Sequence, residues 1–180
     1  MRVPPPKPHR PNQRWALDFV GDALIDGRKF RVLTVIDVFT REALSAVAER
    51  SFPSRKVTAV LDRLILERAQ PDVITLDNGT EFTCKHFDAW AYQRGLKLDF
   101  IRPGKPVNNC FIESFNGRLR DECLSVHWFQ ALDEARRILK TWRMDFNAVR
   151  PHSSLSDQVP QSYLQSLLEV GKTPCKVVTI

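Results

Sequence analysis

The sequence predicts a mixed α/β domain in which an antiparallel meander of strands is extended by parallel strands. Two apolar, β-branched runs at residues 14–25 and 29–39 flank an Asp-Gly-Arg turn signal, a pattern typical of a β-hairpin. Apolar residues over 54–69 recur at helical spacing, and the continuous apolar run at 71–77 indicates a strand buried on both faces. Because parallel strands need a long crossover connection, the helix before this strand favours parallel pairing beside the meander.

The remaining elements follow from the same kinds of pattern. Residues 41–50 are interpreted as a third strand of the meander, although their alanines would also suit a helix. Residues 84–95 are predicted to form a helix that ends at Gly95, because glycine commonly closes helices in the left-handed conformation. The prediction is completed by a strand over 96–101, a loop over 102–109 and helices with apolar faces within 110–124 and 132–146.

The composition is typical of a globular domain in the cytoplasm. A chain of 180 residues, 43% of them hydrophobic, is long enough to bury the core of one domain. No apolar run approaches the ~20 residues of a membrane span, and the first residues lack the apolar core of a signal peptide. The four cysteines and four histidines are scattered, which argues against a disulfide framework or a zinc site. We therefore expect a cytoplasmic protein with no membrane partner.

The charge of the chain favours a polyanionic partner. The formal net charge is +6, and the first fourteen residues alone carry +4 without any acidic residue. Five prolines in the same segment predict an extended, semi-rigid backbone. We interpret residues 1–13 as a basic arm or linker, with a solvated tail without function as the alternative.

Three carboxylates are candidates for a binding site because of where they lie in the predicted strands and helix. Asp18 lies inside an apolar strand, Asp77 ends the strand at 71–77, and Glu113 lies near the start of a helix. An ionised side chain in an apolar strand is costly unless something pairs with it, and three gathered carboxylates would repel one another. Hard divalent cations relieve that repulsion, and oxygen ligands suit Mg²⁺ or Mn²⁺. The sequence therefore predicts a magnesium site to which these three residues contribute.

Other acidic residues compete with these three. Asp37 also ends a strand and is a rival metal ligand, although a role in hydrogen-bonding the turn toward Arg41 is the favoured interpretation. Glu81 lies four residues after Asp77 and rivals Glu113, which is preferred because a helix can bring its acid from across the site. Asn78 and the following glycine predict a tight hairpin turn after Asp77.

Three tryptophans, by contrast, are interpreted as core residues rather than base-stacking platforms, because they fit apolar helix faces. These tryptophans are Trp90, Trp128 and Trp142.

Five strings carry a resemblance to a known family. They are WALDFV, VLTVIDVFTRE, ITLDNGTEF, RPGKPVNNCFIESFNGRLRDECL and FNAVRPHSSL, with 35 residues between Asp77 and Glu113. In this order they are similar to the integrase-core transposases of bacterial insertion sequences, which are relatives of retroviral integrases. The resemblance implies a ribonuclease H-like fold with a mixed five-stranded sheet. It spans residues 14–163, within an expected catalytic core at 14–165 followed by a tail at 166–180.

The resemblance also implies a chemistry. Asp18, Asp77 and Glu113 map onto the catalytic and metal-binding triad of the family, with two Mg²⁺ ions, or Mn²⁺ as a substitute, expected when DNA is bound. The implied reaction nicks the ends of a DNA element and then joins the freed 3′-hydroxyl to target DNA. The implied partners are element ends, target DNA and at least one further copy of the chain. Nucleoid association is expected when DNA is bound.

Four residues are candidates for contact with DNA. They are Lys105, Asn116, Arg118 and Arg120. Glu113, Asn116 and Arg120 fall within one arc at the edge of the apolar helix face, and the family places a basic residue seven positions after its glutamate. The alternative for the cations is a solvated loop and helix edge, and for Asn116 an ordinary helix-surface position.

The chain also departs from the family pattern. Relatives usually carry threonine and aspartate where this sequence has Val107 and Asn108, although asparagine can still cap the following helix. Relatives normally carry an upstream helix-turn-helix segment, so the chain is interpreted as an isolated core or a truncated reading frame. Two alternatives to a strand transferase follow. One is a catalytically weak fragment that acts as a DNA-binding or oligomerisation module, and the other is a nuclease of the same fold.

Overall fold

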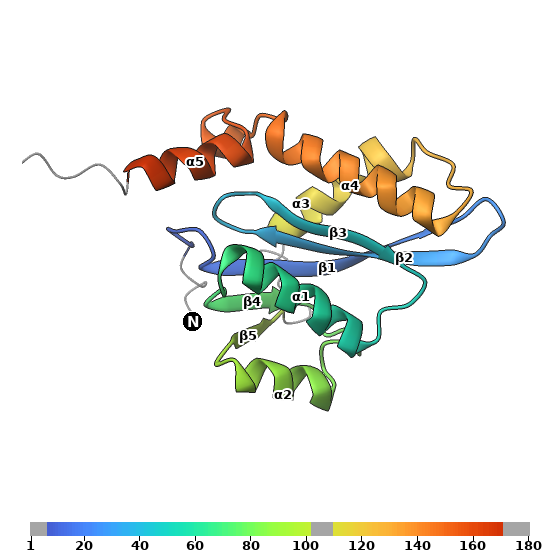
Figure 1. Cartoon of the computed structure of the whole chain (residues 1–180), viewed down its shortest axis with the longest axis horizontal. Helices are drawn as coiled ribbons and strands as arrows, with labels where there is room; N and C mark the ends of the chain where they lie inside the picture. Colours follow the sequence, from blue (N-terminus) through green and yellow to red (C-terminus); the bar gives the residue numbers. More distant parts are fainter. Residues whose placement is uncertain (1–6, 102–109, 171–180) are drawn as a thin grey trace, which may run out of the picture.

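A computed structural model describes residues 7–101 and 110–170 of the chain (Figure 1). A mixed five-stranded sheet in the order β3-β2-β1-β4-β5 forms its centre. The strands are β1 (Arg14–Ala23), β2 (Lys29–Asp37), β3 (Ala43–Glu49), β4 (Val73–Leu76) and β5 (Lys97–Phe100). The helices are α1 (Ser54–Arg68), α2 (Lys85–Gln93), α3 (Cys110–Leu119), α4 (Leu132–Ala148) and α5 (Pro160–Val170), with a π-helical turn η2 (Arg120–Leu124) and a 3₁₀ turn η3 (Ser153–Leu155).

The strand pairing confirms the predicted combination of a meander with parallel strands. β1 pairs with β2 and β2 pairs with β3 in antiparallel fashion, whereas β4 pairs in parallel with both β1 and β5. Gly27 turns the β1–β2 hairpin with φ of 81°, a conformation that glycine adopts without steric cost. β1 therefore lies at the junction of the antiparallel and parallel halves of the sheet.

Helices cover both faces of the sheet (Figure 1). Because side chains alternate along a strand, Trp15 and Leu17 of β1 face the cluster that α1 and α2 complete. Ala16 and Val20 face the opposite cluster, which α3 and α4 complete. Asp18 lies between Ala16 and Val20 in the alternation, so it belongs to the face that α3 covers.

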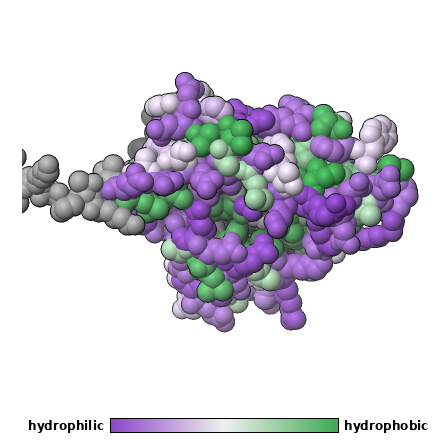
Figure 2. All heavy atoms as spheres, turned by 45° about the horizontal axis from the view of Figure 1, so that its top comes forward, coloured by the Kyte–Doolittle hydropathy of each residue, from purple (hydrophilic) through white to green (hydrophobic). Residues whose placement is uncertain are grey.

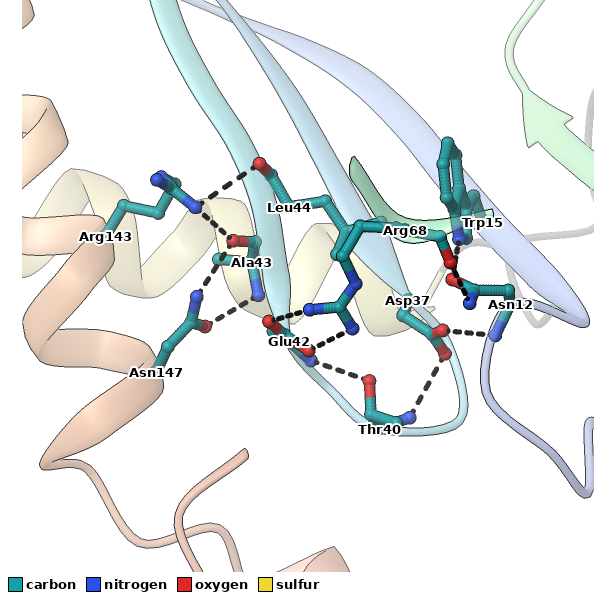
Figure 3. Close-up of polar contacts among 10 residues, drawn as sticks. All are labelled: Asn12, Trp15, Asp37, Thr40, Glu42, Ala43, Leu44, Arg68, Arg143 and Asn147. Carbon is teal, nitrogen blue, oxygen red and sulfur yellow. Dashed lines mark hydrogen bonds and ion pairs between the residues drawn. The ribbon is translucent and has the colours of Figure 1, made fainter. Parts of the chain in front are cut away.

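Residues 43–49 form a strand, not the alternative helix. β3 is an edge strand with a register shift opposite Val35 and Ile36. Side chains of α4 cover its outer edge: the Asn147 amide exchanges hydrogen bonds of 2.8 and 3.0 Å with the backbone of Ala43 (Figure 3). Arg143 donates to the carbonyl oxygens of Ala43 and Leu44. These contacts occupy backbone groups that an edge strand would otherwise expose.

Two local predictions are wrong. Asn78 and Gly79 do not form a hairpin, and neither has a positive φ, because the segment after β4 leads into α2 instead of a returning strand. Trp128 is 83% exposed and precedes α4, whereas Trp90 is buried and Trp142 is half-buried as predicted. Gly95, with φ of 62°, follows α2 in the expected left-handed conformation. The predicted loop at 102–109 lies outside the described residues.

The surface is predominantly polar on the face shown in Figure 2, where apolar side chains form separate patches among hydrophilic ones. In the described part of the chain, no helix has both the length and the apolar character needed to cross a bilayer.

Candidate active site

Asp18 and Asp77 lie on neighbouring parallel strands. The β1–β4 register pairs Trp15 with Ile74 and Ala16 with Thr75, and the same register, continued by two residues, places Asp18 level with Asp77. Side chains at the same level of adjacent parallel strands point to the same face. Asp77 follows the last residue of β4 and is exposed, so its carboxylate lies at the open end of the strand.

The face that carries Asp18 is covered by α3, which brings two further polar residues to the site. Asn116 is only 6% exposed, and its Nδ2 donates a 2.8 Å hydrogen bond to Asp18 Oδ2. Glu113 lies one helical turn before Asn116 and is exposed. The direct contact between Asn116 and Asp18 was not predicted, because it depends on how α3 packs across the sheet.

The charge of Asp18 is disfavoured by its surroundings. Partial burial raises the pKa of Asp18, and the negative charges of Asp77 and Glu113 raise it further. Hydrogen bonds from the Phe19 amide, at 2.7 Å, and from Asn116 act in the opposite direction. A carboxylate that is disfavoured in this way is stabilised by a nearby cation.

The donor set fits a hard divalent cation. Asp18, Asp77 and Glu113 offer only carboxylate oxygens, and Asn116 Oδ1 is buried without a hydrogen-bond partner next to them. Over residues 7–101 and 110–170, no three His, Cys, Asp or Glu side chains are gathered tightly enough to hold a metal as they stand. A cation would therefore have to draw Asp77 and Glu113, both exposed, toward Asp18.

Glu81 has a different partner. It forms an ion pair with Arg31, whose guanidinium lies 3.9 Å from the centre of the Phe19 ring. Although burial acts in the opposite direction, the hydrogen bond and charge of Arg31 lower the pKa of Glu81. Phe19 packs against the α1–α2 cluster, so Arg31 holds Glu81 Oε1 toward that side of the sheet, while Glu81 Oε2 stays near Asp77 Oδ1 at the end of β4. Because the charge of Glu113 acts on Asp18 and Glu81 is already paired with Arg31, Glu113 is favoured over Glu81 as the third acid.

Asp37 is a structural aspartate. Its side chain is fully buried, and its two oxygens accept hydrogen bonds from the backbone amides of Asn12, Phe39 and Thr40 at 2.6, 2.8 and 3.1 Å. Figure 3 shows the bonds from Asn12 and Thr40. It thus organises the turn toward Arg41, as the favoured interpretation predicted, and its oxygens are already committed to these donors.

The candidate DNA contacts separate into different environments. Asn116 is buried against Asp18, and Arg120 is exposed at the start of η2. Arg118 lies on the other flank of α3, where its Nη1 is 3.4 Å from His152 Nε2. Lys105 lies outside the described residues. Among the described residues, Asn116, Arg118 and Arg120 therefore lie in three different environments.

Comparisons with known proteins point to one family. Two family models, both described as integrase core domain, match residues 8–106 and 94–160. The chain is 45% identical over 87% of its length to the insertion element IS407 uncharacterized 31.7 kDa protein of Burkholderia multivorans. It is 42% identical over 85% of its length to the insertion element IS476 uncharacterized 39.2 kDa protein of Xanthomonas euvesicatoria.

The fold is also shared with a solved structure, that of the HTLV-2 integrase catalytic core domain in complex with magnesium. It matches with a TM-score of 0.67 at 18% identity, over 85% of this chain and 96% of that one. The chain spans about half the length of the curated relatives it matches, 56% and 44% respectively. With its ribonuclease H-like fold and these matches, the chain belongs to the integrase core domain family.

Proposed function

We propose that this chain is the catalytic core of a metal-dependent DNA strand transferase, which nicks the ends of a DNA element and joins the freed 3′-hydroxyl to target DNA. The observation that carries the proposal is the placement of Asp18 level with Asp77, with Glu113 close enough to disfavour the Asp18 charge. Such a group of carboxylates costs folding free energy, so a cation-dependent function is the reason we infer for its presence.

Each residue has a specific role in this proposal. Asp18, Asp77 and Glu113 would hold two divalent ions, Mg²⁺ or Mn²⁺, which activate the attacking hydroxyl and stabilise the leaving oxygen of an in-line displacement. Asn116 orients the Asp18 carboxylate through its hydrogen bond. The net charge of +6 favours association with the DNA backbone, and Arg120 and Lys105 are proposed as phosphate contacts.

The proposal extends to the cofactor, to self-association and to the bounds of the core. The integrase core named above was solved with magnesium and in a trimeric form, which supports a magnesium cofactor and self-association here. Strand transfer joins two DNA ends, so at least two copies of the chain would act together. We propose the core at residues 14–165, a basic arm at 1–13 and a tail at 166–180.

A cleavage assay with matched glutamate variants tests the function. The chain is incubated in Mg²⁺ or Mn²⁺ with labelled oligonucleotides that carry an element end, including branched substrates that report the reversal of joining. Wild type and Glu81→Gln should yield nicked and joined products, whereas Glu113→Gln should lose both. Both substitutions remove one carboxylate, but only Glu113 adjoins Asp18.

The products distinguish the alternatives. Nicking without joined strands would identify a nuclease of the same fold. DNA binding without cleavage in either metal would contradict the catalytic proposal and leave a DNA-binding or oligomerisation module. Loss of cleavage in Glu81→Gln but not in Glu113→Gln would reverse the assignment of the third acid.

A smaller effect is expected from Gly79→Ala. A Cβ atom at Gly79 would lie 3.0 Å from Asp77 Oδ1 and 3.2 Å from Glu81 Oε2, so the Asp77 carboxylate would have to move. The contact requires a shift of only a few tenths of an ångström, and because a misplacement of about 1 Å can cost up to ~10²-fold in rate, we expect nicking to slow by roughly 2- to 5-fold. Gly21→Ala is the control, since a Cβ there meets nothing within 4 Å. Equal rates for the two variants would contradict the prediction.

A further inference from the structure

A basic pocket lies on the flank of α3 that faces away from Glu113. It has a volume of about 210 Å³, with an apolar base that includes Ile36, Phe115 and Phe146. Its polar rim comes from three separate segments of the chain: the turn before β3, α3, and the segment around η3. The polar groups are Arg41, Ser114, Arg118, His152, Ser153 and Ser154.

Among the described residues, no carboxylate forms an ion pair with the two arginines of this pocket, although the charge of buried Asp37 acts on Arg41. All 21 acidic side chains of the chain lie within residues 7–101 and 110–170, and none is within 4 Å of the guanidinium nitrogens of Arg41 or Arg118. By contrast, nearby Arg150 is paired with Glu122. Two arginines that converge on one pocket without an ion-pair partner are electrostatically unfavourable, because like charges in a half-buried site repel one another.

Arg41 is held in place for contact with a ligand. Its guanidinium lies 3.7 Å from the centre of the Phe111 ring, donates to the Val38 carbonyl oxygen at 2.7 Å and donates to Ser154 Oγ at 3.2 Å. Its backbone φ is 61°, a conformation that costs an L-residue free energy and that glycine would adopt freely. The three side-chain contacts therefore fix Arg41 at a backbone position that is itself unfavourable.

His152 adds a third nitrogen group to the pocket. Its Nε2 lies 3.4 Å from Arg118 Nη1, and its ring packs edge-on against Phe146 at 5.9 Å between ring centres. Burial lowers the pKa of His152, and the charges of Arg118, Arg41 and Arg150 lower it further. An anion in the pocket would oppose these charges and raise that pKa.

We propose that this pocket binds one phosphate group of a DNA backbone, which Arg118, Arg41, His152 and the hydroxyl of Ser154 contact from different sides. Guanidinium groups match phosphate oxygens with paired hydrogen bonds, and donors arranged around a pocket suit a tetrahedral anion better than a planar carboxylate. The inference rests on the proposed function for its choice of DNA as the source of the phosphate. It adds a second contact region, separated from the acidic site by the width of α3, which would hold the duplex in register with that site.

Two measurements on the full chain test the proposal. In the first, anisotropy of a labelled duplex is followed over a salt series in EDTA, so that no cleavage occurs. Arg118→Gln should weaken binding about 5- to 10-fold and reduce the slope of log Kd against log salt by about 0.9, the value for one lost phosphate contact. Arg55→Gln is the matched control, since Arg55 is exposed on α1 at the opposite face of the sheet.

Arg41→Gly is a second variant of the pocket, which separates loss of DNA contact from loss of folding. Glycine suits the left-handed backbone at this position, so the variant should keep its Tm within a few degrees and still weaken duplex binding as Arg118→Gln does. A loss of affinity that is matched by a large fall in Tm in both variants would indicate a structural role and overturn the proposal.

In the second measurement, inorganic phosphate is added while the imidazole signals of His152 are followed by NMR. Phosphate should raise the pKa of His152 in wild type and do so much less in Arg118→Gln. A response to phosphate with an unchanged DNA salt slope would identify a small-anion site and overturn the DNA assignment. A DNA effect without any response to phosphate would overturn the pocket. The duplex-binding and NMR measurements do not depend on cleavage. If the nicking assay found no cleavage by wild type, the strand-transferase proposal would be lost, but both measurements would still test the pocket.

Discussion

Asp18→Asn is expected to abolish metal-dependent cleavage and, at the same time, to stabilise the metal-free protein. The carboxylate lies between Asn116 and the two other acids, so in the proposed function it contributes to holding both the metal and the reacting phosphate. Loss of a charged ligand removes several kcal/mol of transition-state stabilisation, and ~4 kcal/mol corresponds to a rate loss of about 10³-fold. The nicking assay described above measures this loss.

The gain in stability has a separate cause. The Asp18 charge is partly buried and faces the charges of Asp77 and Glu113, so a neutral side chain of the same shape relieves both costs. Asparagine Oδ1 can still accept the 2.7 Å hydrogen bond of the Phe19 amide, and Asn116 can turn its unpartnered Oδ1 toward the new amide. We expect an increase of about 1 kcal/mol, or roughly 2–4 °C in Tm for a domain of this size.

Asp22→Asn is the control for both effects. Asp22 lies on the same strand and face, and it also accepts a hydrogen bond from the next amide, that of Ala23, at 2.8 Å. It should leave cleavage and Tm nearly unchanged because it is not next to the other two acids. A lower Tm in Asp18→Asn than in wild type would contradict the view that the acidic site is a cost to the fold.

Asp37→Ala is expected to produce the largest loss of stability. The substitution leaves three backbone amides, those of Asn12, Phe39 and Thr40, without their acceptor in a buried turn. Hydrogen bonds to a charged group contribute about 1.5–3 kcal/mol each, part of which water recovers when the turn opens. We expect a net loss of about 3 kcal/mol in the free energy of unfolding, measured by urea denaturation.

Asp37→Asn separates hydrogen bonding from charge. It keeps an acceptor for Phe39 and Thr40 and loses the one for Asn12, so it should cost less than Asp37→Ala. Burial raises the pKa of Asp37, although the three amides and the charge of Arg68 lower it. An acid whose pKa is raised by folding contributes stability that is fully present below its unfolded pKa and is lost as the pH rises through its folded pKa.

The stability of wild type should therefore decline relative to that of Asp37→Asn as the pH rises from about 4, the ordinary aspartate pKa, through the raised value. Urea denaturation of both proteins across this range measures the difference. Parallel pH profiles would show that Asp37 does not titrate with folding.

Local sequence patterns were sufficient for the elements themselves. The periodicity of apolar residues identified β1, β2, α1, β4 and α4 because burial of one face imposes that periodicity on any sequence that folds in this way. They were not sufficient at residues 78 and 79, where a strong turn signal does not form a hairpin. Turn propensity is worth little free energy, and the connection from β4 into α2 decides the backbone there.

For the site, local sequence patterns identify the candidate residues, and the packing of the fold sets which of them become neighbours. A carboxylate inside an apolar strand, at Asp18, is unfavourable in any fold without a partner, so it is conspicuous from sequence alone. Whether Glu81 or Glu113 joins it depends on tertiary packing: α3 brings the charge of Glu113 to act on Asp18, whereas Glu81 is paired with Arg31.

The two flanks of α3 illustrate the same division. Sequence determines that Glu113, Asn116 and Arg118 share a helix, because that follows from local spacing. Only the packing of α3 across β1 and beside α4 directs Asn116 to Asp18 and Arg118 to the pocket of Arg41 and His152. Contacts between residues far apart in the chain are set by the burial of whole faces, and no local pattern records which polar groups that burial brings together.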